Sequence, residues 1–159
     1  LTELCGVLEH QDHVRLRNQL AILSETVAAA VATYGDSQQN VIEIHQLFFE
    51  LRGKLWTHMF REEHGLYSSI GNSERNWVDP YCASSVIIGA IRVVRREHRH
   101  FRRSFRRIAE LLSNYEIPGN SGQRYVNLVH GFRNLESLKL KHMQKEEIVY
   151  RGALALAAR

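Results

Sequence analysis

The apolar residues of this chain recur at helical spacing in four long stretches. Three short polar breaks separate these stretches, and this pattern limits the possible folds more than any other feature of the sequence. In the third stretch the apolar side chains recur in steps of four and three residues, which places them on one helix face. The breaks fall where glycine, proline, serine and asparagine gather, at 34–39, 71–80 and 117–123. They leave four segments, roughly 2–34, 37–70, 80–115 and 121–157.

Short connections between long helices favour antiparallel neighbours. The sequence therefore predicts an all-α fold, an antiparallel up-down-up-down four-helix bundle, as one domain over residues 1–159. The breaks also suggest caps. We expect Gly35 to end the first helix, Asp36 or Ser37 to cap the second, Asp79 before Pro80 to cap the third, and Ser121 to cap the fourth.

Each apolar stripe carries a histidine on or beside it: His13, His58, His98 and His142. Two of the stripes also carry a glutamate four residues later, Glu62 and Glu146. Residues four apart lie on one face of a helix, so each glutamate can reach the same point as its histidine. A charge on a core-facing stripe is costly unless it is paired or binds a metal ion.

The histidines and glutamates form an internal repeat. The chain reads HMFREE at 58–63 and HMQKEE at 142–147, and a single histidine precedes each motif, by 45 residues in the first half and 44 in the second. Two such hairpins packed with approximate two-fold symmetry would give both halves of a dinuclear site equivalent ligands. Imidazole and carboxylate suit iron, manganese and zinc, and residue types alone do not choose among them. The alternative is a metal-free bundle whose core histidines are hydrogen-bonded.

The other histidines and two neighbouring glutamates are expected outside the ligand set. We expect His10, His45, His64, His100 and His130 at the surface or beside a ligand, with His10 one turn from His13. Glu63 and Glu147 follow the proposed ligands directly and turn about 100° away from them, so we expect both in solvent. Either one is the alternative ligand if the helix phase differs from this expectation.

Charge and cysteine usage bear on partners and location. The net charge is +4, and the segment 91–107 holds eight arginines, which fit either an anion-binding patch or, as we favour, a solvated helix face. No helix-turn-helix or zinc-finger spacing accompanies them, so nucleic acid is not an expected partner. Two cysteines make no disulfide framework, which favours a reducing cytoplasm. No run of 18 apolar residues predicts a membrane span, and the chain starts at Leu1, compatible with a piece of a longer protein.

These motifs resemble the hemerythrin-like HHE cation-binding family, and within it the repair-of-iron-centres (RIC) di-iron proteins. The resemblance covers essentially the whole chain. It rests on HVRLRNQL at 13–20, the two HMxxEE motifs, and GAIRVVRREH at 89–98. It implies two non-haem iron ions, oxo- and carboxylate-bridged, with ligands His13, His58, Glu62, His98, His142 and Glu146, of which Glu62 and Glu146 are the bridges.

The resemblance also implies a function in nitrosative or oxidative stress or in iron–sulfur cluster repair. The expected partners are O2, NO and peroxide, with iron–sulfur proteins as iron acceptors. An iron- or oxygen-sensing module and a catalase-like di-iron enzyme are the alternatives, so enzymatic activity stays open at this point.

Two departures narrow the resemblance. The oxygen-carrying hemerythrins have His-x-x-x-His in the third helix and His-x-x-x-x-Asp in the fourth, where this chain has Arg102 and Glu147. This argues against a five-histidine oxygen carrier. This sequence also does not include the short cysteine-bearing N-terminal domain of many RIC proteins, and without that domain a full repair role is not expected.

Overall fold

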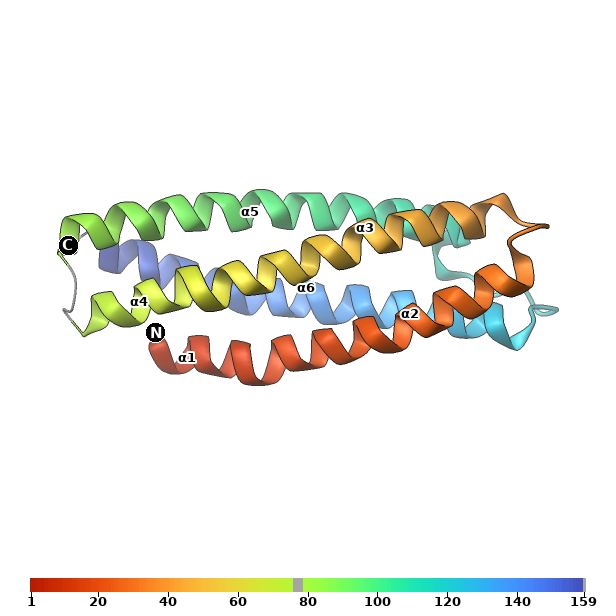
Figure 1. Ribbon diagram of the computed structural model, residues 1–159, viewed down its shortest axis with the longest axis horizontal. Helices are drawn as coiled ribbons and strands as arrows, with labels where there is room; N and C mark the ends of the chain where they lie inside the picture. The colour runs from red at the N-terminus through yellow and green to blue at the C-terminus, as the bar shows by residue number, and fades with distance from the viewer. Residues whose placement is uncertain (76–78, 159) are drawn as a thin grey trace.

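The computed structural model describes residues 1–75 and 79–158, and this part of the chain is helical with no strand. The helices join into long continuous segments that run side by side, here called rods (Figure 1). The first runs through α1 (Thr2–Val7), the π-helical turn η1 (Leu8–His13) and α2 (Val14–Tyr34). The second runs through α3 (Gln39–Arg61), the π-helical turn η2 (Glu62–Tyr67) and α4 (Ser68–Glu74). The third is α5 (Pro80–Leu111), followed by the short 3-10 turn η3 (Ser113–Tyr115), and the fourth is α6 (Gln123–Ala157).

The rods form the predicted antiparallel bundle. Helix α2 packs against α3 and α6, and α5 packs against the same two helices. Both chain ends lie at one end of the bundle, as an up-down-up-down path requires (Figure 1). Among the described residues, no helix is long and apolar enough to cross a membrane.

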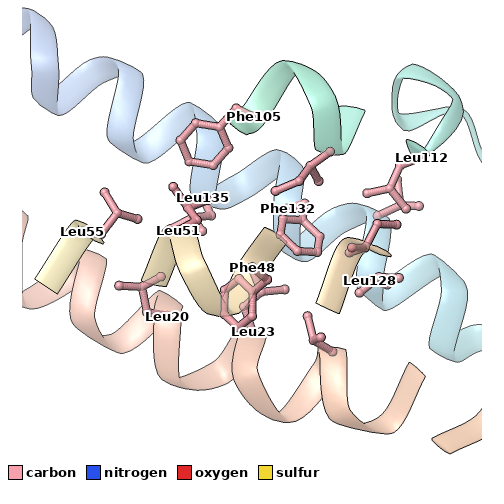
Figure 2. Close-up of a cluster of buried hydrophobic side chains, with 14 of the residues drawn as sticks. Leu20, Leu23, Phe48, Leu51, Leu55, Phe105, Leu112, Leu128, Phe132 and Leu135 are labelled. Atoms are coloured by element: carbon pink, nitrogen blue, oxygen red, sulfur yellow. The ribbon is translucent and has the colours of Figure 1, made fainter. Parts of the chain in front are cut away.

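The core consists of two apolar clusters. The larger one fills the end near the α2–α3 connection and includes Phe48, Phe105 and Phe132 (Figure 2). The smaller one lies near the chain termini and includes Leu66, Ile87 and Tyr150. Between them lie the buried polar side chains, so the bundle holds one polar layer between two apolar plugs. This arrangement keeps bulk water away from the polar layer.

The two π-helical turns fall beside this layer and are confined to the first hairpin. Turn η1 ends at His13 and η2 begins at Glu62. A π turn accommodates one extra residue. This explains the five-residue step on the first stripe between Leu8 and His13, both of which are buried. The stripes of α5 and α6 keep regular steps of three and four.

The helix ends confirm two predictions and correct two. Helix α2 ends at Tyr34 with Gly35 as its C-cap residue, as predicted. The Asp79 side chain accepts hydrogen bonds from the backbone N–H groups of Tyr81 and Cys82, and Pro80 follows it. Helix α3 begins after Gln38, however, and α6 begins after Gly122, both without a side-chain cap. The predicted caps Asp36, Ser37 and Ser121 are therefore wrong, since each lies at least one residue too early in its connection.

The third helix ends four residues before the end of the predicted segment 80–115. Helix α5 stops at Leu111, and Ser113, Asn114 and Tyr115 then adopt positive φ angles of 50°, 56° and 66°. Left-handed residues turn the chain out of a helix. The Tyr115 hydroxyl donates a hydrogen bond of 2.7 Å to Glu136 on α6, which anchors this turn to the bundle.

The caps generate a stability prediction. Replacing Asp79 by alanine should cost about 1 kcal/mol of unfolding free energy, because two N–H groups of the first turn lose their acceptor. Replacing Asp36, an exposed loop residue that caps nothing, should leave the unfolding free energy unchanged. Urea denaturation followed by circular dichroism measures both. Equal losses in the two variants would contradict this assignment.

Candidate metal centre

The polar layer contains all six side chains that the sequence singles out. His13 comes from η1, His58 from α3, Glu62 from η2, His98 from α5, and His142 and Glu146 from α6. All six are buried, and His98 is the most accessible, with 8% of its surface exposed. All six side chains thus lie in the interior, and the bundle brings them together.

The six residues form two overlapping groups that share both glutamates. One group is His13, Glu62, His142 and Glu146, and the other is His58, Glu62, His98 and Glu146. Within each group, one donor atom per residue lies within 4.8 Å of all the others. Two histidines and two shared carboxylates per group could serve as the donor set of two adjacent metal positions, and carboxylate oxygens can bridge such positions.

The ring nitrogens face one another in a way that favours a cation between them. The Nε2 atoms of His13 and His142 are 3.0 Å apart, and those of His58 and His98 are 3.3 Å apart. In each pair a single hydrogen can lie between two nitrogen lone pairs, whereas a metal ion accepts both. We call these the His13–His142 position and the His58–His98 position.

One carboxylate oxygen is left without a hydrogen-bond donor. Glu62 Oε2 is buried and makes no hydrogen bond, although the Nε2 atoms of His13 and His58 lie 3.3 Å away. Buried polar atoms are almost always satisfied, so such an atom calls for an explanation. A cation between the groups would satisfy it, and the donor set therefore fits a metal ion.

Three of the four histidines are oriented by a carboxylate from another helix. The Nδ1 atoms of His13, His58 and His142 lie 2.6, 2.9 and 3.4 Å from Glu63, Glu97 and Asp12, respectively. Each of these carboxylates is in turn paired with a cation closer to the surface: Arg17, Arg61 and Lys145, respectively. Carboxylates of this kind fix the ring orientation and increase ligand basicity. The expectation that Glu63 lies in solvent is therefore wrong, because its carboxylate turns towards η1.

The carboxylates follow a sequence rule that our sequence reasoning missed. Asp12, Glu63 and Glu97 each stand next to a proposed ligand in the chain, yet each binds a histidine on a different helix. By the same rule Glu147 would hold His98. Instead Glu147 accepts hydrogen bonds from Arg95, at 2.6 and 3.2 Å, and from Arg151. A third of the Glu147 side chain is exposed.

A buried lysine is the second feature that our sequence reasoning missed. Lys139 is fully buried, and its Nζ lies 3.0 Å from both His58 Nε2 and Glu146 Oε1. The signal was present in the sequence, since Lys139 continues the α6 stripe between Leu135 and His142 in steps of four and three. A lysine on that stripe was as unusual as the glutamate that follows it.

Charge pairing keeps both glutamates ionised in this interior. Burial opposes the ionisation of Glu146, but the Lys139 ammonium and His142 outweigh it and hold the pKa of this carboxyl well below its ordinary value. For Glu62, burial and the neighbouring Glu146 raise the pKa, yet His58 and His13 outweigh them and lower it. Both side chains are therefore carboxylates at neutral pH, the form that binds metal.

Two buried tyrosines close the layer on the side of the smaller apolar cluster. The Tyr150 hydroxyl donates a hydrogen bond to Glu62 Oε1, the oxygen that does not face the histidines. Tyr67 stacks against His13 with ring centroids 6.1 Å apart, and its hydroxyl has no hydrogen-bond partner. Burial and the nearby carboxylates raise the pKa of both phenols, so they remain O–H donors.

The remaining histidines lie outside the centre, as expected. His10, His45, His64 and His130 are exposed and His100 is half-buried. His10 does not hold His13, since the Nδ1 atom of His13 is bonded to Glu63. The arginine-rich segment forms one wall of an open groove of about 540 Å³, lined by His98, Glu147 and four arginines: Arg95, Arg99, Arg102 and Arg151. The layer is thus closest to solvent at His98.

Comparison with known proteins agrees with this geometry. A search of curated proteins gives no significant match. The family model of the hemerythrin HHE cation binding domain matches residues 8–154, which include all six residues of the two groups. With that match and a buried histidine–glutamate centre in a four-helix bundle, the chain belongs to the hemerythrin HHE cation-binding family.

Proposed function

We propose that this chain is a non-haem di-iron protein that acts in the response to nitrosative or oxidative stress, through small ligands such as NO, O2 or peroxide. The observation that carries the proposal is the pair of four-residue groups that share Glu62 and Glu146. When bound there, two iron ions would supply redox chemistry and open positions for small ligands. The choice of iron rests on family membership.

The residues of the chain support this proposal in three ways. Glu62 and Glu146 offer oxygens to both positions, while each pair of histidines belongs to one position. Asp12, Glu63 and Glu97 hold three of the rings in place. The two apolar clusters exclude water from the layer.

Burial also restricts what can reach the centre. The ligand residues are at most 8% exposed, so a large substrate has no access to them. Molecules of a few atoms remain, which fits NO, O2 and peroxide. Release of iron to a damaged iron–sulfur protein, the RIC-type activity, is the finer form of this proposal. It rests on the sequence resemblance.

The di-iron proposal predicts metal content. After anaerobic loading with ferrous iron, the protein should hold two irons per chain, one per group, and melt at a higher temperature than the metal-free form. His13→Ala should lose one iron. His130→Ala, which changes an exposed histidine on the same bundle, should keep both. Elemental analysis measures the iron content and thermal denaturation measures the melting temperature. If the protein holds no metal after this loading, the proposal is excluded.

The orienting carboxylates predict an effect on affinity. Glu63→Gln keeps a side chain of the same size but removes the charge that faces the His13 Nδ1 atom. Metal affinity should fall by about 10- to 100-fold. Glu147→Gln is the matched control, because Glu147 holds no ligand histidine and its affinity effect should be negligible. Competition with a chelator measures both, and equal effects would contradict the orienting role of Glu63.

The reactivity of the loaded protein tests the biological part of the proposal. The diferrous protein should consume NO or peroxide, and His58→Ala should abolish the reaction. Iron transfer to an apo iron–sulfur protein would identify the RIC-type activity. Sustained O2 evolution from peroxide would identify a catalase-like enzyme instead. If the loaded protein reacts with neither NO nor peroxide and transfers no iron, the stress-response proposal fails. Measurement of partner binding then tests the sensing role.

A further inference from the structure

The two metal positions differ in their surroundings, and the largest difference is Lys139. Its Nζ contacts His58 Nε2 at 3.0 Å and both Glu146 oxygens, at 3.0 and 3.4 Å. Glu146 is shared by both positions, whereas His58 belongs to the His58–His98 position alone. The ammonium therefore already uses the His58 lone pair that a metal ion would need at that position.

The two histidines of the His13–His142 position have no such competitor. In the part of the chain that the structure describes, no ammonium or guanidinium contacts the Nε2 atom of either histidine. The nearby cations Arg17 and Lys145 lie on the outer side, where they bind Glu63 and Asp12. Lys139 reaches this position only through the shared Glu146.

A second difference concerns His98. The other three ligand histidines each have a carboxylate at Nδ1, whereas no described carboxylate lies within hydrogen-bond distance of the His98 Nδ1 atom. Glu147, which stands where such a partner would be expected, is held by Arg95 and Arg151. A histidine without this support is a poorer ligand. His98 also borders the arginine-lined groove.

Charge adds a third reason for unequal binding. The two shared carboxylates carry two negative charges, and the three orienting carboxylates are already paired with surface cations. The positive charge of one divalent ion and the Lys139 ammonium together already exceeds the negative charge of the two shared carboxylates. A second divalent ion next to that ammonium would add repulsion in a poorly screened interior.

We propose that Lys139 makes the two metal positions unequal, so that the first ion binds at the His13–His142 position and the second binds only as the ammonium leaves the His58–His98 position. This inference rests on the metal-binding function proposed above. It gives the protein a stable state with one metal ion and one resident ammonium. The weakly held ion is then the one beside His98 and the groove, where it is available for exchange or transfer.

The interior offers the displaced ammonium an alternative contact. The ring of Phe101 lies 5.5 Å from Lys139 Nζ, a distance at which an aromatic face attracts a cation. This contact does not use any ligand atom. Movement towards Phe101 would therefore free His58 and Glu146 without leaving the ammonium unpartnered.

Anaerobic titration of the metal-free protein with Co2+ tests the inference, by calorimetry and by the visible absorption of the bound ion. The wild-type chain should show two binding steps whose dissociation constants differ by at least about tenfold. In Lys139→Met the weaker step should strengthen by about tenfold or more. Lys141→Met, which changes an exposed lysine two residues away, should keep the wild-type profile.

Ligand variants assign the steps independently of whether Lys139→Met folds. His98→Ala should lose the weaker step alone, and His142→Ala should lose the tighter one. Two equal steps in the wild-type chain, an unchanged gap in a folded Lys139→Met protein, or loss of the tighter step in His98→Ala would each overturn the inference. Two equal steps would leave the metal-binding function intact, whereas no binding of Co2+ or Fe2+ at all would overturn that function itself.

Discussion

The burial of two carboxylates at the centre of a helical bundle is the constraint on which the rest of this structure depends. Glu62 and Glu146 are fully buried, and transfer of an unpaired carboxylate into such an interior is prohibitively costly. The surrounding imidazoles and the Lys139 ammonium offset part of this cost. One oxygen of Glu62 still lacks a donor, so the protein atoms alone do not complete the layer.

The rest of the bundle serves this layer. The apolar clusters on both sides keep water out of the layer. Three carboxylates each bind a histidine on a different helix. Behind each of these three histidines lies a carboxylate, and behind each carboxylate lies a cation nearer the surface. The π-helical turns adjust the first hairpin so that His13 and Glu62 face inward. The sequence repeat is close to symmetric, but Lys139 and the diverted Glu147 make the two halves chemically different.

Much of this was predictable from the sequence, and the failures have identifiable causes. The apolar steps predicted the four helices, and the repeated His-x-x-x-Glu spacing predicted that six polar side chains meet in one layer, as they do. The roles of Glu63 and Glu97 were missed because their partners lie on other helices, and helix phase reports only which way a side chain leaves its own helix. Lys139 was missed because lysine is usually a surface residue, although its place on the α6 stripe was visible. The prediction of Ser121 as a cap was wrong because a cap must directly precede the first helical residue. The path of the α5–α6 connection sets that residue, which is Gln123.

Diffraction from crystals of the iron-loaded protein, recorded at the iron absorption edge, would show whether the polar layer holds two iron ions. We expect two anomalous density peaks in the polar layer, both beside Glu62 and Glu146, one between His13 and His142 and the other between His58 and His98. At limiting iron the peak between His58 and His98 should have the lower occupancy. When this position is fully occupied, the Lys139 side chain should be displaced from it. Peaks at the surface alone, or none between the shared glutamates, would contradict the account.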